Sequence, residues 1–86
     1  MTTIALRAQV TGVATDGGMV LLDERSGRYW QLNATARLVL QHLLDGQTPE
    51  QAATALADAY PDAASRAASD VEQLLASLRS LHLLAD

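Results

Sequence analysis

The chain has 86 residues, of which 49% are hydrophobic, and its formal net charge is −4. This length suits one small domain, which we expect to span residues 1–86. Its core must consist of Leu, Val and Ala, because Phe is absent. The acidic balance disfavours nucleic acid as a partner, since phosphates bind clustered basic side chains. Cys is also absent, which excludes disulfides, Cys-based metal sites and a thiol nucleophile.

The first third of the chain predicts three strands. Residues 4–13 alternate apolar and polar side chains with the period of two that is typical of a half-buried strand. A Gly-rich turn at residues 15–18 leads to an apolar strand at residues 19–23. A hairpin loop that ends at Gly27, a residue suited to positive φ, leads to a third strand at residues 28–32. The face of the first strand that is expected to turn inward consists of Ile4, Leu6, Ala8 and Val10.

After the third strand the hydrophobic period changes to that of a helix. Asn33 is a good N-cap, and the apolar residues that follow recur at a spacing of three and four until Gly46, which suits a helix C-terminus. Thr48 and Gln51 have the spacing of a capping box for a second helix, which Pro61 ends. The inward face of this second helix is expected to consist of Ala52, Ala53, Leu56 and Tyr60.

A third helix is expected to begin between residues 62 and 65 and to continue to about residue 81. At about 100° per residue, its apolar stripe is wider than one partner helix needs, so one border of the stripe should face a groove. One border carries Arg66, Asp70 and Ser77, and the other carries Glu72 and Arg79. Either border could be the one that faces the groove. The stripe consists of Ala64, Ala67, Val71, Leu74, Leu75, Leu78 and Leu81.

This element order predicts an α+β, winged-helix-turn-helix-like fold, in which a three-stranded antiparallel sheet is followed by three helices. The third strand lies at an edge, where unpaired N–H and C=O groups can bind an extended peptide. We expect Trp30 and Leu32 to face the core, with Trp30 as its largest residue, and Tyr29 and Gln31 to face outward.

The sequence offers little for catalysis or metal binding. His42 and His82 lie on different predicted elements, and there is no His-Glu-x-x-His motif, Gly-rich phosphate loop or nucleophile elbow. We therefore expect no catalytic residues, no metal and no cofactor. The predicted third helix begins with one basic residue, Arg66, and two acidic residues, Asp62 and Asp70, which argues against a DNA-recognition helix.

No apolar run approaches the roughly 18 residues of a membrane span, and the N-terminus lacks the pattern of a signal peptide. These features predict a cytoplasmic protein with no membrane partner.

Several short motifs, in this order and spacing, resemble the PqqD-like family over essentially the whole chain. They are Val-Leu-Leu-Asp at residues 20–23, Ser-Gly-Arg-Tyr-Trp-Gln-Leu-Asn at residues 26–33 and Leu-Asp-Gly at residues 44–46. Asp70-Val71 with the leucines that follow completes the pattern. The Tyr-Trp-Gln-Leu-Asn variant is similar to the stand-alone members of lasso-peptide clusters.

The resemblance implies a recognition element for ribosomally synthesised and post-translationally modified peptides (RiPPs). Such a protein is not a catalyst. It holds the leader segment of a precursor peptide as an added strand between its third strand and its third helix. The implied leader pattern is Tyr-x-x-Pro-x-Leu, and the implied protein partners are a transglutaminase-like leader peptidase and a cyclase. The implied peptide-binding residues are Arg28, Tyr29, Trp30, Gln31, Leu32, Arg66, Ala67, Asp70, Val71, Leu74 and Leu78.

Three other interpretations stay open. The same fold serves, in the family, as a peptide chaperone for a radical SAM enzyme in pyrroloquinoline quinone biosynthesis. A small winged-helix DNA-binding regulator is a second alternative. A dimerisation module is the third, because an open edge strand can pair with its own copy across a two-fold axis. We expect a monomer or a weak homodimer.

Overall fold

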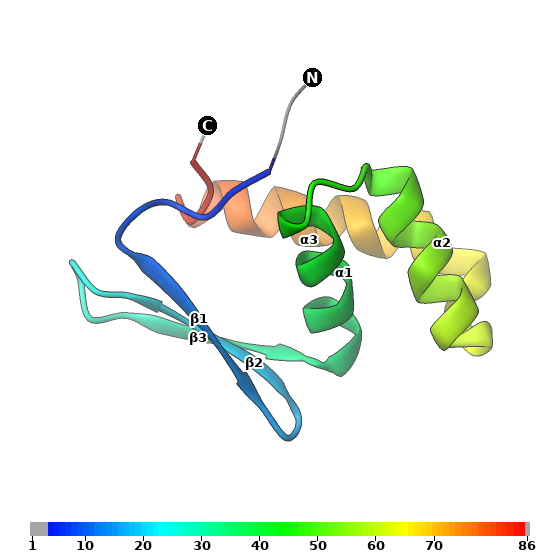
Figure 1. Cartoon of the computed structure of the whole chain (residues 1–86), viewed down its shortest axis with the longest axis horizontal. Helices are drawn as coiled ribbons and strands as arrows, with labels where there is room; N and C mark the ends of the chain where they lie inside the picture. Colours follow the sequence, from blue (N-terminus) through cyan, green and yellow to red (C-terminus); the bar gives the residue numbers. More distant parts are fainter. Residues whose placement is uncertain (1–3, 86) are drawn as a thin grey trace.

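The structure is a computed structural model that describes residues 4–85 (Figure 1). It confirms the predicted α+β class, with an antiparallel sheet in the order β1-β2-β3 followed by the helices. A 3-10 helix, η1, precedes the last α-helix. The elements are β1 (Val10–Thr15), β2 (Gly18–Asp23), β3 (Tyr29–Asn33), α1 (Ala34–Leu44), α2 (Pro49–Ala59), η1 (Pro61–Arg66) and α3 (Ala67–Ser80).

The sheet is a meander of two hairpins with a fixed register. Leu21 of β2 lies opposite Trp30 of β3, and the β2–β3 loop contains Gly27 at a φ of 76°, as predicted. Gly18, at a φ of 155°, packs so closely on β3 that a Cβ atom there would overlap the carbonyl oxygen of Leu32. Glycine is therefore required where β2 begins.

The helix termini form as the capping signals predict. The side chain of Asn33 accepts a hydrogen bond from the N–H of Ala36 at 2.9 Å, and Gly46 ends α1 at a φ of 94°. Thr48 and Gln51 form the reciprocal capping box of α2, with distances of 2.9 and 3.1 Å. These local bonds fix the turn from β3 into α1, and that turn orients the helices against the sheet.

The helices lie on one side of the sheet, and α1 is the helix that packs on it (Figure 1). α1 contacts both β2 and β3 on one side and α2 on the other, and α3 packs on α2 and α1. The opposite face of the sheet is exposed and includes Val13, Leu22 and Tyr29. The buried core is aliphatic, as the composition predicts, and its largest fully buried side chains are Leu21, Leu40, Leu43, Leu56, Val71 and Leu83.

The prediction of one strand over residues 4–13 is wrong. β1 begins only at Val10, because a turn precedes it in which the N–H of Val10 donates to the carbonyl of Arg7 at 2.9 Å. Upstream of this turn the chain pairs with its own C-terminal segment, where Leu6 lies opposite Leu84. Residues 4–7 do alternate between half-buried and exposed side chains, but they belong to this separate bridge and not to β1. Ala8, which the sequence predicts to face inward, is exposed. The third strand is shifted by one residue from the predicted range, since Arg28 precedes β3.

The predicted third helix is shorter than expected at both ends. Because η1 has about three residues per turn, the buried position before α3 is Ala63 rather than Ala64. α3 ends at Ser80, and Leu81 is 39% exposed because the chain turns there. His82 takes a left-handed φ of 58°, and the chain then returns to bury Leu83 and Leu84.

Tyr60 is a further correction, because it is the C-cap residue of α2 and is exposed rather than part of its inward face. Among the described residues, none of the helices combines the length and the apolar character that a membrane span requires.

The two adjacent glycines of the first hairpin provide a test of this packing. We expect Gly18→Ala to lower the free energy of unfolding by more than about 2 kcal/mol, because its Cβ meets backbone at a left-handed φ. Gly17→Ala is the matched control and should cost less than about 0.5 kcal/mol, since nothing lies within 4 Å of its Cβ position. Urea unfolding followed by circular dichroism measures both, and equal losses would contradict the close approach.

Candidate peptide-binding groove

β3 is the edge strand of the sheet, and no strand of the described chain pairs with its outer side. The N–H of Asp23 donates to the carbonyl of Arg28 at 2.8 Å, which sets the phase of the β2–β3 ladder. Because bonded and non-bonded pairs alternate along an antiparallel ladder, every second residue from Arg28 directs its backbone groups to β2. The intervening residues Tyr29 and Gln31 therefore direct their N–H and C=O groups to the open edge.

The side chains of β3 alternate as predicted. Trp30 and Leu32 are half-buried and pack against the core, whereas Gln31 is exposed and Tyr29 is 64% exposed on the outer face. The expectation that Trp30 is the largest residue of the core holds only in part, since it lies at the margin of the core. Arg28 is exposed and precedes the strand.

A groove of about 390 Å³ opens where β3 passes into α1, between the first turn of α1 and α3. Asn33 both ends β3 and lines this groove, so the open edge and the groove are continuous. The fully buried side chains of Val39 and Leu56 form an apolar floor. The other lining residues are Thr35, Ala36, Arg66, Asp70, Gln73, Leu74 and Ser77.

This lining shows which border of the last helix faces the groove. Arg66, Asp70 and Ser77 line it, so the groove side is the border that carries these three residues. Glu72, from the other border, lines a separate cavity of only about 70 Å³ beside α2. The sequence left this choice open because the two borders have similar composition.

The predicted helix residues divide into two groups. Leu74 is half-buried and lines the groove, together with Arg66 and Asp70. Ala67, Val71 and Leu78 are at most 3% exposed and pack in the core, so they support the wall of the groove from behind. Sequence reasoning missed the groove residues Thr35, Ala36 and Gln73. Gln73 lies one helical turn after Asp70, and this spacing was the available signal.

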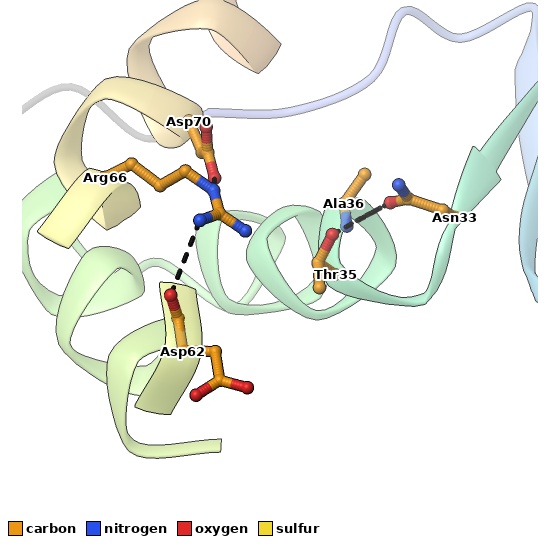
Figure 2. A network of polar contacts seen from close by, with 6 residues as sticks. All are labelled: Asn33, Thr35, Ala36, Asp62, Arg66 and Asp70. Atoms are coloured by element: carbon orange, nitrogen blue, oxygen red, sulfur yellow. Dashed lines mark hydrogen bonds and ion pairs between the residues drawn. The ribbon is translucent and has the colours of Figure 1, made fainter. Parts of the chain in front are cut away.

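Figure 2 shows the polar contacts of residues from the two walls of the groove, with Arg66 and Asp70 on one wall and Asn33, Thr35 and Ala36 on the other. The Arg66 Nε lies 3.6 Å from a carboxylate oxygen of Asp70, and the Arg66 Nη1 donates to the backbone carbonyl of Asp62 at 3.4 Å. On the opposite wall the Asn33 Oδ1 accepts hydrogen bonds from the Ala36 N–H at 2.9 Å and the Thr35 hydroxyl at 3.0 Å. Together these residues place polar walls over an apolar floor, which suits side chains of a bound peptide.

The two histidines lie apart from this groove. His42 pairs through Nδ1 with the side chain of Gln47 at 2.7 Å, and His82 occupies the left-handed position after α3. Within residues 4–85, no three His, Asp or Glu side chains come together in a way that could hold a metal ion.

An antiparallel sheet whose edge strand β3 has no partner strand on its outer side within the described chain, beside a groove on the following helices, is the architecture that the family resemblance implies. The chain belongs to the PqqD family: the family model described as Coenzyme PQQ synthesis protein D (PqqD) matches residues 18–84. No curated protein matches the chain.

Two solved structures are similar to the chain along nearly its whole length. The first is described as "Lasso peptide synthetase B1 complexed with the leader peptide". It is 41% identical with a TM-score of 0.88, and the match covers 99% of this chain and 100% of that chain. The second is described as "TbiB1 in Complex with the TbiA(beta) Leader Peptide". It is 26% identical with a TM-score of 0.80, and the match covers 94% and 98% of the two chains.

Two neighbouring leucines of α3 test the orientation of this helix. Leu75 is 4% exposed, so we expect Leu75→Ala to destabilise the protein by about 2–5 kcal/mol. Leu74 is half-buried at the groove, so Leu74→Ala should cost less than about 1.5 kcal/mol. Urea unfolding of the two variants measures the difference. A larger loss for Leu74→Ala than for Leu75→Ala would mean that α3 is rotated from the orientation described.

Proposed function

We propose that the chain is a non-catalytic RiPP recognition element of lasso-peptide biosynthesis, which binds the leader segment of a precursor peptide. The observation that carries the proposal is the free edge of β3, which runs directly into the groove between α1 and α3. Both similar structures are described as complexes with leader peptides, which supports the same role here.

In this proposal the leader extends the sheet by one strand. Tyr29 and Gln31 each supply one N–H donor and one C=O acceptor to the leader backbone, and each bond contributes roughly 1 kcal/mol net. These bonds do not depend on the leader's side chains. Selectivity comes from leader side chains that point toward the helices and enter the groove, where Leu74 and the apolar floor receive them.

The remaining predicted partners fit this role but rest on the resemblance. A leader peptidase of transglutaminase-like type and a cyclase would receive the bound precursor, in the cytoplasm and without a cofactor on this chain. The description of the matching family favours one second candidate, a peptide chaperone for a radical SAM enzyme in pyrroloquinoline quinone biosynthesis. Both candidates share leader binding and differ in the enzyme served. Arg66 is the only basic residue in residues 61–70, so we do not propose DNA binding.

A proline at the open edge tests the added strand. We expect Gln31→Pro to weaken leader binding at least about tenfold, because it removes an N–H that points to the leader while leaving the β2–β3 bonds in place. The measurement is a fluorescence-polarisation titration with a labelled leader peptide that carries the Tyr-x-x-Pro-x-Leu pattern.

Gln31→Val is the matched control, since it changes the same side chain but keeps the N–H and should bind nearly as the wild type does. Circular dichroism establishes that the variants remain folded. If Gln31→Pro and Tyr29→Pro are both folded and both bind at wild-type strength, the leader is not an added strand.

The enzyme served distinguishes the two candidate functions. We expect the chain to accelerate cleavage of the precursor by the leader peptidase of its own gene cluster, because it raises the local concentration of the substrate. Cleavage is followed by mass spectrometry with and without the chain, and Gln31→Pro should abolish the acceleration. Acceleration of a radical SAM enzyme instead of the peptidase would favour the quinone-cofactor candidate.

A further inference from the structure

Arg66 lies at the junction of η1 and α3, where it ends the first helix and begins the second. It is the N-cap residue of α3 and makes no capping hydrogen bond with its side chain. Ser, Thr, Asp and Asn stabilise this position, whereas a positive charge there opposes the helix dipole. Arg66 and Asp70 do form an i,i+4 pair, but with the basic residue first, which is the weaker of the two orders. The positive charge suits the last turn of η1, whereas at the start of α3 it breaks a local preference, and there it lies beside the groove.

The guanidinium of Arg66 has unused capacity to bind. Its side chain is 63% exposed, and its two polar contacts, at 3.6 Å to Asp70 and 3.4 Å to the carbonyl of Asp62, are long for charge-assisted hydrogen bonds. An arginine carries five N–H donors, so several can serve a ligand that enters the groove. In Figure 2 the carboxylate of Asp62 points away from the guanidinium, so Asp70 is the carboxylate partner there.

The opposite wall of the groove also favours a negative charge. It is formed by the first turn of α1, where Asn33, Thr35 and Ala36 line the groove. This turn contains no acidic residue, so no carboxylate of its own offsets the positive end of the α1 dipole. The guanidinium of Arg66 and this wall together favour a negatively charged ligand group. Among the lining residues, only Asp70 would repel such a group.

We infer that Arg66 is a specificity-determining residue that binds an Asp or Glu side chain of the leader, and that Asp70 is a built-in competitor for the same guanidinium. The inference rests on the proposed function, because the ligand is a side chain of the peptide bound at β3. In the free protein Asp70 keeps the guanidinium at the groove. When the leader binds, its carboxylate replaces Asp70, and the exchange restricts binding to leaders with an acid at this place.

The two members of the pair should therefore respond to substitution in opposite directions. Arg66→Gln should weaken binding of the wild-type leader by about tenfold, since it removes a charge-assisted contact. Asp70→Asn should tighten binding by about two- to fivefold, because it removes the competitor and a like charge. If the pair merely stabilises α3, the two substitutions should act in the same direction, and through stability alone.

The experiment is a titration of the leader that binds the wild-type chain, together with versions in which each Asp or Glu is changed singly to Asn or Gln. We expect one such change to lower the affinity of the leader for the wild-type chain about tenfold. The same change should not lower the affinity for Arg66→Gln any further. Arg79→Gln and Glu72→Gln are the matched controls, because they remove the same charges from α3 at residues that do not line the groove. Urea unfolding of every variant separates binding from stability.

Three results would overturn the inference. The first is that Arg66→Gln binds the leader as tightly as the wild type does. The second is that Asp70→Asn weakens leader binding while the protein remains folded. The third is that no acidic residue of the leader is coupled to Arg66. In each of these cases a leader that still depends on the N–H of Gln31 leaves the proposed function in place. If no leader binds the wild-type chain at all, the proposed function and this inference fail together.

Discussion

The pairing of β2 with β3 is the constraint on which the rest of the structure depends. The hydrogen bond from Asp23 to Arg28 sets which residues of β3 are satisfied within the sheet, and it leaves the backbone groups of Tyr29 and Gln31 pointing outward. A shift of one residue in this register would exchange the two sets and would also turn Trp30 from the core to solvent. The same register thus determines the core packing and the vacant edge.

The edge is useful only because the chain turns immediately after it. Asn33 ends β3 and caps α1 through the N–H of Ala36, so the groove begins where the strand stops. A long exposed edge strand invites aggregation, but β3 has only five residues and is bounded by the hairpin loop and this cap. A short edge that leads into a groove favours a short extended segment over another complete sheet.

The sequence predicted the elements whose signals are local. The caps at Asn33 and Thr48, the turn at Gly27 and the alternation of Trp30 with Gln31 all depend on neighbouring residues, and the structure confirms them. The family resemblance extended these signals to the fold and to the strand side of the candidate site.

The error in the first strand arose where distant parts of the chain meet. The alternation of residues 4–7 has the period of a sheet strand, but its partner is Leu84, at the other end of the chain. No local pattern marks the return of the chain after His82, which buries Leu83 and pairs it with Arg7. The groove border on α3 likewise depends on how η1 sets the rotation of that helix, which a periodicity count does not give.

Affinity and selectivity have different origins in this arrangement. In the proposed complex the backbone groups of β3 would bind any extended segment, so an edge alone would hold unrelated peptides nearly as well as the correct leader. On this proposal, discrimination would come from the helix side, where Leu74 and the apolar floor line the groove and would accept side chains by size. In an aliphatic pocket, the binding free energies of side chains that differ by one methylene differ by only about 1–3 kcal/mol. A charge at the mouth of the pocket that a ligand leaves unpaired excludes that ligand more strongly. The Arg66–Asp70 pair is the one charged feature of the groove, and it lies where it can add this second kind of selection to the first.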